Sequence, residues 1–208
     1  NIKSEPLLLL IKQFIQDEAL MEQFRRAPAA AQLHHAYLGG LLEHTLNVLE
    51  LALLVIPRYP RVSLDLVLAG TFLHDIGKTA ELTYDTSFGY TDSGQLVGHI
   101  TLAAVWIQEK AKQAEAETGQ PIPKELLAML QHVVLSHHGS HEFGSPKLPA
   151  FPEAIAVHYL DNIDAKLHLY LREIDADPDE QSHWTQFQRS LDTRIYKVRL
   201  QDAADNKK

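Results

Sequence analysis

Apolar residues recur every three to four positions along most of the chain, the spacing that places them on one face of a helix. Each predicted helix also has a plausible start or stop, such as Ser63 as an N-cap and Pro57 as a breaker. The predicted helices cover residues 5–24, 40–56, 63–75, 98–118, 123–136 and 152–173. This pattern predicts an all-α helical bundle.

Two stretches depart from the helical pattern. Residues 82–91 predict a short β-hairpin or an irregular flap, and a plain surface loop fits them equally well. After an acidic linker at 175–180, residues 182–199 read as a C-terminal helix followed by an extended segment around Tyr196. We expect a single domain over residues 1–200 and a frayed tail over 201–208.

Composition narrows the classes of function. The chain has 208 residues with 45% apolar content, enough for one domain with a sizeable core. Its 19 basic and 27 acidic residues give a net charge of −8, which argues against nucleic-acid binding by general electrostatics. A phosphate-bearing substrate would need local positive charge, which bound divalent cations could supply.

The chain contains no cysteine, which excludes a thiol nucleophile, a disulfide framework and a zinc knuckle. This fits a reducing compartment, and we expect a cytoplasmic protein. The apolar run from Leu7 to Ile11 is far too short for a membrane span, so we expect no membrane anchor. Long apolar faces such as residues 46–56 leave a homo-oligomer open.

The main chemical anomaly is Asp75, which follows His74 at the end of an apolar helix. An unpaired buried carboxylate would cost several kcal/mol, so Asp75 needs a cation, a metal ion or dense hydrogen bonding. A neighbouring histidine or lysine is the structural alternative. A metal ion would need further ligands from distant segments, and the candidates are His44, His99, His137, His138 and Asp161.

Imidazole nitrogens and carboxylate oxygens together suit manganese, iron, nickel, cobalt or zinc better than magnesium, which prefers oxygen ligands. Helical proteins build two-metal carboxylate sites from inward groups on several facing helices. A carboxylate beside a histidine can bridge two ions. Asp75 is therefore the expected bridge.

The order His44, His74-Asp75, His99, His137, Asp161 resembles the ligand series of the HD-domain metal-dependent phosphohydrolase superfamily. Within it, several motifs spread over residues 5–200 resemble the YhaM-type 3′-to-5′ exoribonucleases. These motifs are Ala27-Pro28-Ala29-Ala30, Gly39-Gly40-Leu41-Leu42-Glu43-His44-Thr45, His74-Asp75-Ile76-Gly77-Lys78, Ser136-His137-His138-Gly139, Gly144-Ser145-Pro146 and His158-Tyr159-Leu160-Asp161-Asn162-Ile163-Asp164-Ala165.

The resemblance implies two sets of metal ligands, which are His44, His74, Asp75 and Asp161 for one ion and Asp75, His99 and His137 for the other. His138 would be a further ligand or would support one. Lys78 would approach the scissile phosphate. Phosphate contacts from Arg25, Arg26 or His34 stay open.

From this resemblance we expect a phosphodiesterase with two divalent transition-metal ions, manganese preferred. It would trim RNA or single-stranded DNA from the 3′ end and release 5′-mononucleotides. Relatives of this type carry an N-terminal oligonucleotide-binding β-barrel, and no strand-rich segment precedes the first predicted helix, so we expect reduced affinity for RNA. The alternatives are a nucleotidase or phosphomonoesterase acting on free nucleotides, a di-iron oxygenase, and a non-catalytic nucleotide-binding module.

Overall fold

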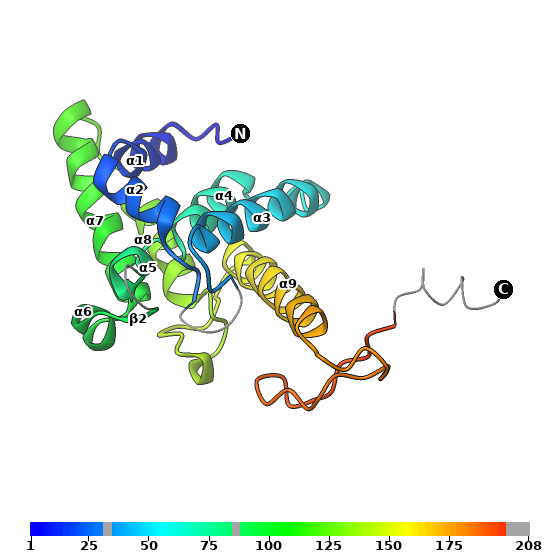
Figure 1. The fold of residues 1–208 in the computed structure, drawn as a ribbon. Coiled ribbons are helices and arrows are strands. Elements are labelled where there is room, and N and C mark those ends of the chain that lie inside the picture. Colours follow the sequence, from blue (N-terminus) through cyan, green and yellow to red (C-terminus); the bar gives the residue numbers. More distant parts are fainter. Residues whose placement is uncertain (31–34, 85–87, 199–208) are drawn as a thin grey trace. The chain divides into compact units, whose positions relative to one another are not determined.

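The computed structural model describes residues 1–30, 35–84 and 88–198 (Figure 1). The chain forms two compact units, residues 1–165 and 166–208, and we describe each by itself. The single domain expected over residues 1–200 stays a prediction. The expected frayed tail, residues 201–208, lies outside the described residues.

The first unit is almost entirely helical, which confirms the predicted all-α class (Figure 1). Its elements are α1 (Glu5–Ile15), α2 (Glu18–Arg26), α3 (Gly40–Val55), the 3₁₀ turn η1 (Ile56–Arg58), α4 (Leu64–Leu73), α5 (Lys78–Glu81), β1 (Leu82–Thr83), β2 (Gly89–Tyr90), α6 (Asp92–Leu96), α7 (His99–Thr118), α8 (Lys124–Ser136) and η2 (His141–Phe143). The last helix, α9 (Pro152–Asp175), begins in the first unit and ends in the second.

The two strands form the short excursion that the sequence suggested at residues 82–91. They pair antiparallel, with Leu82 opposite Tyr90 and Thr83 opposite Gly89. The strands are only two residues long, so the pair is a small addition to the helical fold and does not form a sheet layer.

The single helix expected over residues 5–24 is wrong, because the chain breaks into α1 and α2 at Asp17. The Asp17 carboxylate accepts a hydrogen bond from the backbone N–H of Leu20 at 3.1 Å, which makes it the N-cap of α2. Its other oxygen accepts a hydrogen bond from Lys110 Nζ at 2.8 Å. The apolar period continues across the break, which is why periodicity alone did not reveal it.

Two apolar clusters hold the helices of the first unit in place. The larger cluster joins α1, α2, α4, α7 and α8, and its fully buried side chains include Leu10, Phe14, Leu73, Ile107 and Leu130. Each such side chain contributes on the order of 1.5–3 kcal/mol on burial. In Figure 1, α7 packs against α1 and α8.

The smaller cluster joins α3, α4, α8 and α9. Its buried side chains are Val48, Ala52, Ile56, Val67, Leu68, Val133, Ala154, Val157 and Leu160. These contacts fix one face of each of the four helices. The polar residues that interrupt those apolar faces are consequently brought toward one another.

One helical stretch of the described chain, Gly40–Arg58, is long and apolar enough to cross a membrane by length and composition. The core helix of a globular protein passes the same test. This stretch carries His44 and Thr45 on its buried side and packs against α4. The expectation that the protein has no membrane anchor stays a prediction.

In the second unit, the described residues after α9 form a looped segment, so the helix expected within 182–199 is wrong. Trp184 and Tyr196 form an antiparallel bridge, and Gln188 and Thr193 form another. Asp192 turns the chain between them with a left-handed backbone, φ 52°. Aromatic and β-branched side chains favour such extended pairing over a helix.

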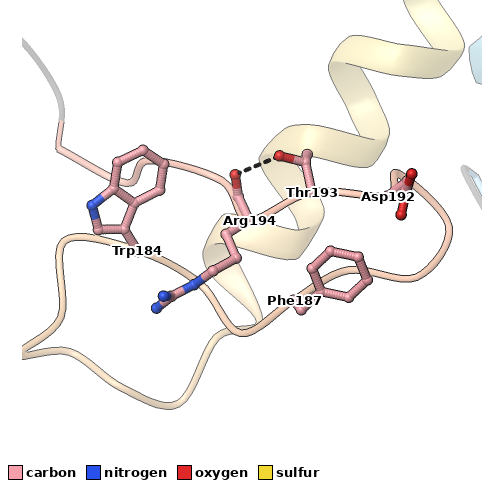
Figure 2. Close-up of a pocket in the computed structure, with 5 residues that line it drawn as sticks. All are labelled: Trp184, Phe187, Asp192, Thr193 and Arg194. Atoms are coloured by element: carbon pink, nitrogen blue, oxygen red, sulfur yellow. Dashed lines mark hydrogen bonds between the residues drawn. The ribbon is translucent and has the colours of Figure 1, made fainter.

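This segment also contains a shallow pocket of about 430 Å³ (Figure 2). It is lined by Trp184, Phe187, Asp192, Thr193 and Arg194. The lining offers one carboxylate and no imidazole, so it does not have the donors that a transition-metal ion prefers. The candidate chemistry lies in the first unit.

Candidate metal centre

The His74-Asp75 pair stands at the end of α4, where the helix gives way to a turn that leads into α5. Gly77 lets this turn approach α7, because a Cβ there would lie 2.2 Å from the carbonyl oxygen of His99. No other residue fits against that backbone. The glycine of the motif thus brings the start of α7 next to Asp75.

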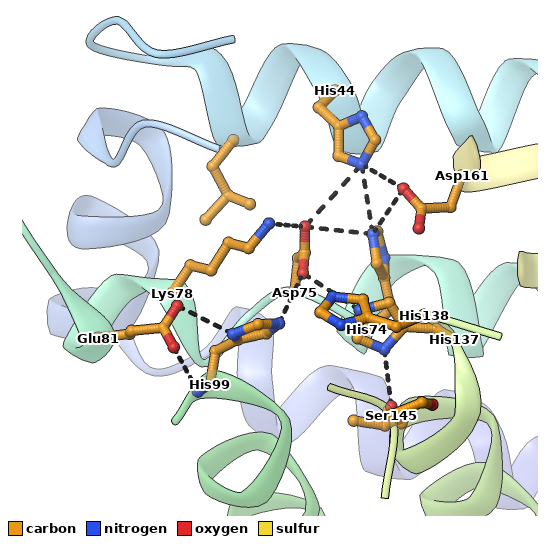
Figure 3. A network of polar contacts seen from close by, with 12 residues as sticks. His44, His74, Asp75, Lys78, Glu81, His99, His137, His138, Ser145 and Asp161 are labelled. Atoms are coloured by element: carbon orange, nitrogen blue, oxygen red, sulfur yellow. Dashed lines mark hydrogen bonds and ion pairs between the residues drawn. The ribbon is translucent and has the colours of Figure 1, made fainter. Parts of the chain in front are cut away.

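Asp75 lies at the centre of the site, with only 3% of its surface exposed (Figure 3). Its Oδ1 lies 3.4 Å from His99 Nε2 and 3.5 Å from His137 Nε2. Its Oδ2 lies 3.4 Å from His74 Nε2 and 3.9 Å from His44 Nε2. The two carboxylate oxygens therefore face two different groups of imidazoles.

The first group contains His44 on α3, His74 after α4 and Asp161 on α9. His44 Nε2 lies 3.3 Å from His74 Nε2 and 3.1 Å from Asp161 Oδ1. Burial acts to raise the pKa of Asp161, but the hydrogen bond from His44 and the surrounding imidazoles hold this pKa well below its usual range. Asp161 is thus ionised and available as a ligand.

The same contacts act on His44 in the opposite sense. Burial favours the neutral imidazole, but the carboxylates of Asp161 and Asp164 outweigh burial and raise the pKa of His44 to about 9. Without a metal ion, this imidazole therefore carries a proton at neutral pH.

The second group contains His99 on α7 together with His137 and His138 after α8. With Asp75, these side chains offer four ligand atoms that lie within 4.8 Å of one another. Burial lowers the pKa of His137, and burial with the adjacent imidazoles lowers the pKa of His138 to about 3. Both are neutral at pH 7, the state in which an imidazole binds a metal ion.

Gly139, which follows His138, allows the backbone to turn tightly against His158. Gly139 has φ +78°, and a Cβ there would lie 2.1 Å from the His158 ring. His138 Nδ1 contacts the carbonyl oxygen of Phe143 at 2.7 Å, so its Nε2 is the atom available to a ligand.

The buried polar atoms at the centre indicate whether the site could hold a cation. Among the described residues, Asp75 Oδ1, His99 Nε2 and His137 Nε2 are buried and have no hydrogen-bond partner. A buried polar atom without a partner costs free energy, and native proteins satisfy nearly all of them. A carboxylate oxygen and two imidazole nitrogens that converge in this way are the donors of a divalent transition-metal site. The residues fit a cation.

Models of known protein families identify the family to which the chain belongs. The family model described as "HD domain" matches residues 41–166. The chain belongs to the HD-domain family. The matched residues of this HD domain include every candidate metal ligand, from His44 to Asp161. No solved structure matches the chain.

Several curated relatives of this HD domain are named 3′-5′ exoribonuclease YhaM. The protein from Bacillus pumilus is 43% identical over 154 residues, which cover 74% of this chain and 47% of the relative. The protein from Bacillus subtilis is 39% identical over 153 residues, with the same coverage. The protein from a Geobacillus species is 43% identical over 154 residues. The chain spans about half the length of these relatives.

The remaining predicted residues divide into two groups. Lys78 points into the HD-domain centre, where its Nζ lies 2.6 Å from Asp75 Oδ2. Arg25 lies on the surface of α2 and pairs with Glu22 at 3.5 Å, and Arg26 is also exposed. His34 lies outside the described residues. A phosphate contact from these three stays a prediction.

Three polar residues next to the centre, two of them buried and Asp164 partly exposed, were not predicted as parts of it. Glu81 on α5 contacts His99, and Asp164 on α9 contacts His44. His35 is fully buried, and its Nε2 lies 3.8 Å from Asp164 Oδ2. Asp164 follows Asp161 by three residues, which places both on one helix face, and this spacing was the available signal.

Proposed function

We propose that this HD domain is a metal-dependent phosphodiesterase that removes nucleotides from the 3′ end of single-stranded RNA and releases 5′-mononucleotides. The arrangement of Asp75 carries the proposal, because its two oxygens face two separate groups of ligands. A carboxylate in that position can be shared by two cations. The name of the curated relatives, 3′-5′ exoribonuclease, supports RNA as the substrate and the 3′-to-5′ direction.

We further propose that the centre would hold two divalent cations, with Asp75 belonging to both sets of ligands. His44, His74 and Asp161 would complete one set, and His99, His137 and His138 would complete the other. Mixed nitrogen and oxygen donors favour manganese, with iron, cobalt, nickel or zinc as substitutes. Two cations bound there would supply Lewis acidity, which lowers the pKa of water and neutralises charge on a phosphate.

The side chains of this chain have two tasks in the reaction. Asp75, buried and ionised, fixes the separation of the two ligand sets. Lys78 stands beside it, with its Nζ 2.6 Å from Asp75 Oδ2, and its side chain is partly exposed. We propose that its ammonium group contacts a phosphate oxygen of the substrate, where negative charge increases in the transition state.

The acidic surface makes these local charges important. With a net charge of −8, the chain has no general attraction for a polyanion. Lys78 and the cations would therefore provide the attraction for phosphate where the bond is cleaved. We expect binding to single-stranded RNA to depend strongly on added metal.

The direct test incubates metal-analysed protein and Mn²⁺ with a single-stranded RNA labelled at its 5′ end. We expect a ladder that shortens from the 3′ end, with 5′-mononucleotides as the product. A matching DNA strand measures the preference for RNA. Products of internal cleavage, or inorganic phosphate released from mononucleotides while the RNA stays intact, would contradict the proposal; the second result would identify a nucleotidase.

A further inference from the structure

The imidazoles of the centre are oriented in two different ways. His74 Nδ1 contacts the backbone carbonyl of Thr71 at 2.6 Å, and His137 Nδ1 contacts that of Val134 at 2.7 Å. In both cases the acceptor lies three residues earlier in the same segment. These two rings are held by local backbone geometry, which follows from the helix itself.

The His138 ring contacts the backbone carbonyl of Phe143. The remaining two rings lie against carboxylates from separate elements. His44 Nδ1 lies 2.7 Å from Asp164 Oδ2, a residue 120 positions away. His99 Nδ1 lies 2.9 Å from Glu81 Oε2 (Figure 3). Each of the two ligand sets thus contains one histidine that depends on a distant carboxylate for its orientation.

We propose that Glu81 and Asp164 are positioning residues, each responsible for one of the two cation sites. Each carboxylate keeps the proton of its histidine on Nδ1 and so leaves the Nε2 lone pair directed at the centre. Outer carboxylates of this kind fix the tautomer and raise the basicity of a metal-binding histidine. This inference rests on the proposed binding of two cations.

Glu81 holds His99 at two points. Its Oε1 accepts a hydrogen bond from the backbone N–H of His99 at 3.0 Å, while its Oε2 faces the ring. His99 is the first residue of α7, and the preceding Gly98 has no side chain with which to cap the helix. A carboxylate at this end also suits the helix dipole. Glu81 thus accepts a hydrogen bond from the His99 backbone and lies within ion-pair distance of the His99 ring.

Asp164 acts together with Asp161 from a single helix. Asp161 Oδ1 faces His44 Nε2 at 3.1 Å, and Asp164 Oδ2 faces Nδ1 of the same ring at 2.7 Å. The two aspartates are three residues apart on α9, so they project from one face. The ring of His44 is held between them and cannot rotate without losing both contacts.

Asp164 could instead be a ligand of a separate cation, but the chemistry of imidazole argues against this role. His35, His44 and Asp164 lie close enough to hold a cation of their own. For that, His44 would have to bind one cation through Nδ1 and another through Nε2, which requires the loss of both ring protons. A neutral imidazole has one lone pair to give, so we assign Asp164 to orienting the ring.

The test measures the Co²⁺ affinity of Glu81→Gln, Asp164→Asn and the unmodified protein by equilibrium dialysis. The glutamine can keep its carbonyl oxygen on the His99 N–H, so the helix cap survives, but its NH₂ group then faces Nδ1. Glu117→Gln is the matched control, because Glu117 accepts a hydrogen bond from Gln13 at 2.7 Å near the other end of α7. Melting curves in EDTA verify that each variant folds.

We expect two Co²⁺ per chain in the unmodified protein and in Glu117→Gln. Each variant of a positioning residue should weaken one Co²⁺ by about 10–100-fold and leave the other nearly unchanged. In the metal-free Glu81→Gln protein, ring ¹⁵N NMR should show the His99 proton moved from Nδ1 to Nε2. The double variant should weaken both ions.

Three outcomes would decide against the inference or against its basis. Co²⁺ isotherms equal to those of Glu117→Gln, with an unchanged His99 ring spectrum, would overturn it. A third Co²⁺ that disappears in Asp164→Asn would also overturn the assignment of Asp164. An unmodified protein that binds no Co²⁺ would refute the proposed function, whereas a tautomer change in Glu81→Gln would still support the orienting role of Glu81.

Discussion

The two halves of the centre share Asp75 but differ in their chemistry. The acidic half, defined by His44, His74 and Asp161 around Asp75 Oδ2, pairs two imidazoles with two carboxylates. The imidazole half, defined by His99, His137 and His138 around Asp75 Oδ1, gathers three imidazoles at a single carboxylate oxygen.

This difference shows in the protonation of the metal-free protein. In the acidic half, the carboxylates raise the pKa of His44 to about 9 and so balance their own charge with a proton. In the imidazole half, burial dominates and lowers the pKa of His138 to about 3. We therefore expect the first half to release a proton when it binds a cation, and the second half to bind one without that release.

The donors also favour different ions. Oxygen-rich sites suit manganese, whereas imidazole-rich sites suit zinc, cobalt and nickel. We therefore expect the two halves to differ in metal preference, although one carboxylate joins them.

The largest effect is expected for Asp75→Ala, because this side chain belongs to both halves. Both cations should be lost together, and nucleotide release should fall by more than the roughly 10²–10³-fold that one charge-stabilising group contributes. Metal analysis of the purified variant and product analysis with labelled RNA measure the two effects. Retention of two ions per chain would show that Asp75 is not the shared ligand.

Lys78→Ala should separate catalysis from metal binding. We expect both ions to remain and turnover to fall by about 10²–10³-fold, because the lost ammonium group would contact phosphate in the transition state. Lys110→Ala is the control, since Lys110 pairs with Asp17 outside the centre. Equal turnover in the two lysine variants would contradict this role for Lys78.

The pH dependence of stability in the metal-free protein should distinguish the acidic half from the imidazole half. The folded, metal-free protein binds a proton at His44 more tightly than the unfolded chain does, because the pKa rises from 6.5 to about 9. This stabilisation is complete below pH 6.5 and is lost as pH rises through 9. It amounts to roughly 3 kcal/mol at 1.36 kcal/mol per pKa unit.

Melting curves in EDTA between pH 6 and 9.5 measure this loss, and His44→Ala should remove its contribution. Cation binding to the acidic half should change in the opposite direction and tighten as pH rises toward 9, because the proton of His44 must leave. A melting temperature that rises over this range in the unmodified protein, with no change of slope in His44→Ala, would contradict the assignment.

The smallest effect is expected away from both halves, at the N-cap of α2. Asp17→Ala removes the acceptor for the Leu20 N–H and should cost about 1 kcal/mol of stability. The melting temperature should fall by about 2–4 °C. Metal content and RNA products should stay unchanged. Asp17→Asn keeps an acceptor for the N-cap and should lose less stability. An equal loss of stability in both variants would indicate that the ion pair with Lys110, not the cap, is responsible.

The sequence by itself determined the helical class, the HD-domain relationship and the order of the candidate ligands. Helical periodicity is a local property, so it located α3, α4, α7, α8 and α9 and the short pairing near residues 82–91. It missed the break at Asp17, where a side-chain cap overrides a continuous apolar stripe. It also predicted a helix within 182–199, where the described residues up to 198 form none.

Only the tertiary structure decided how the ligands are grouped and oriented. Which oxygen of Asp75 faces which histidine depends on where four helix ends meet, and no spacing along the chain contains that information. The partners of His44 and His99 are Asp164 and Glu81, and Asp164 lies 120 positions from its histidine. Periodicity identifies the buried face of each helix, whereas packing between helices selects which polar groups meet there.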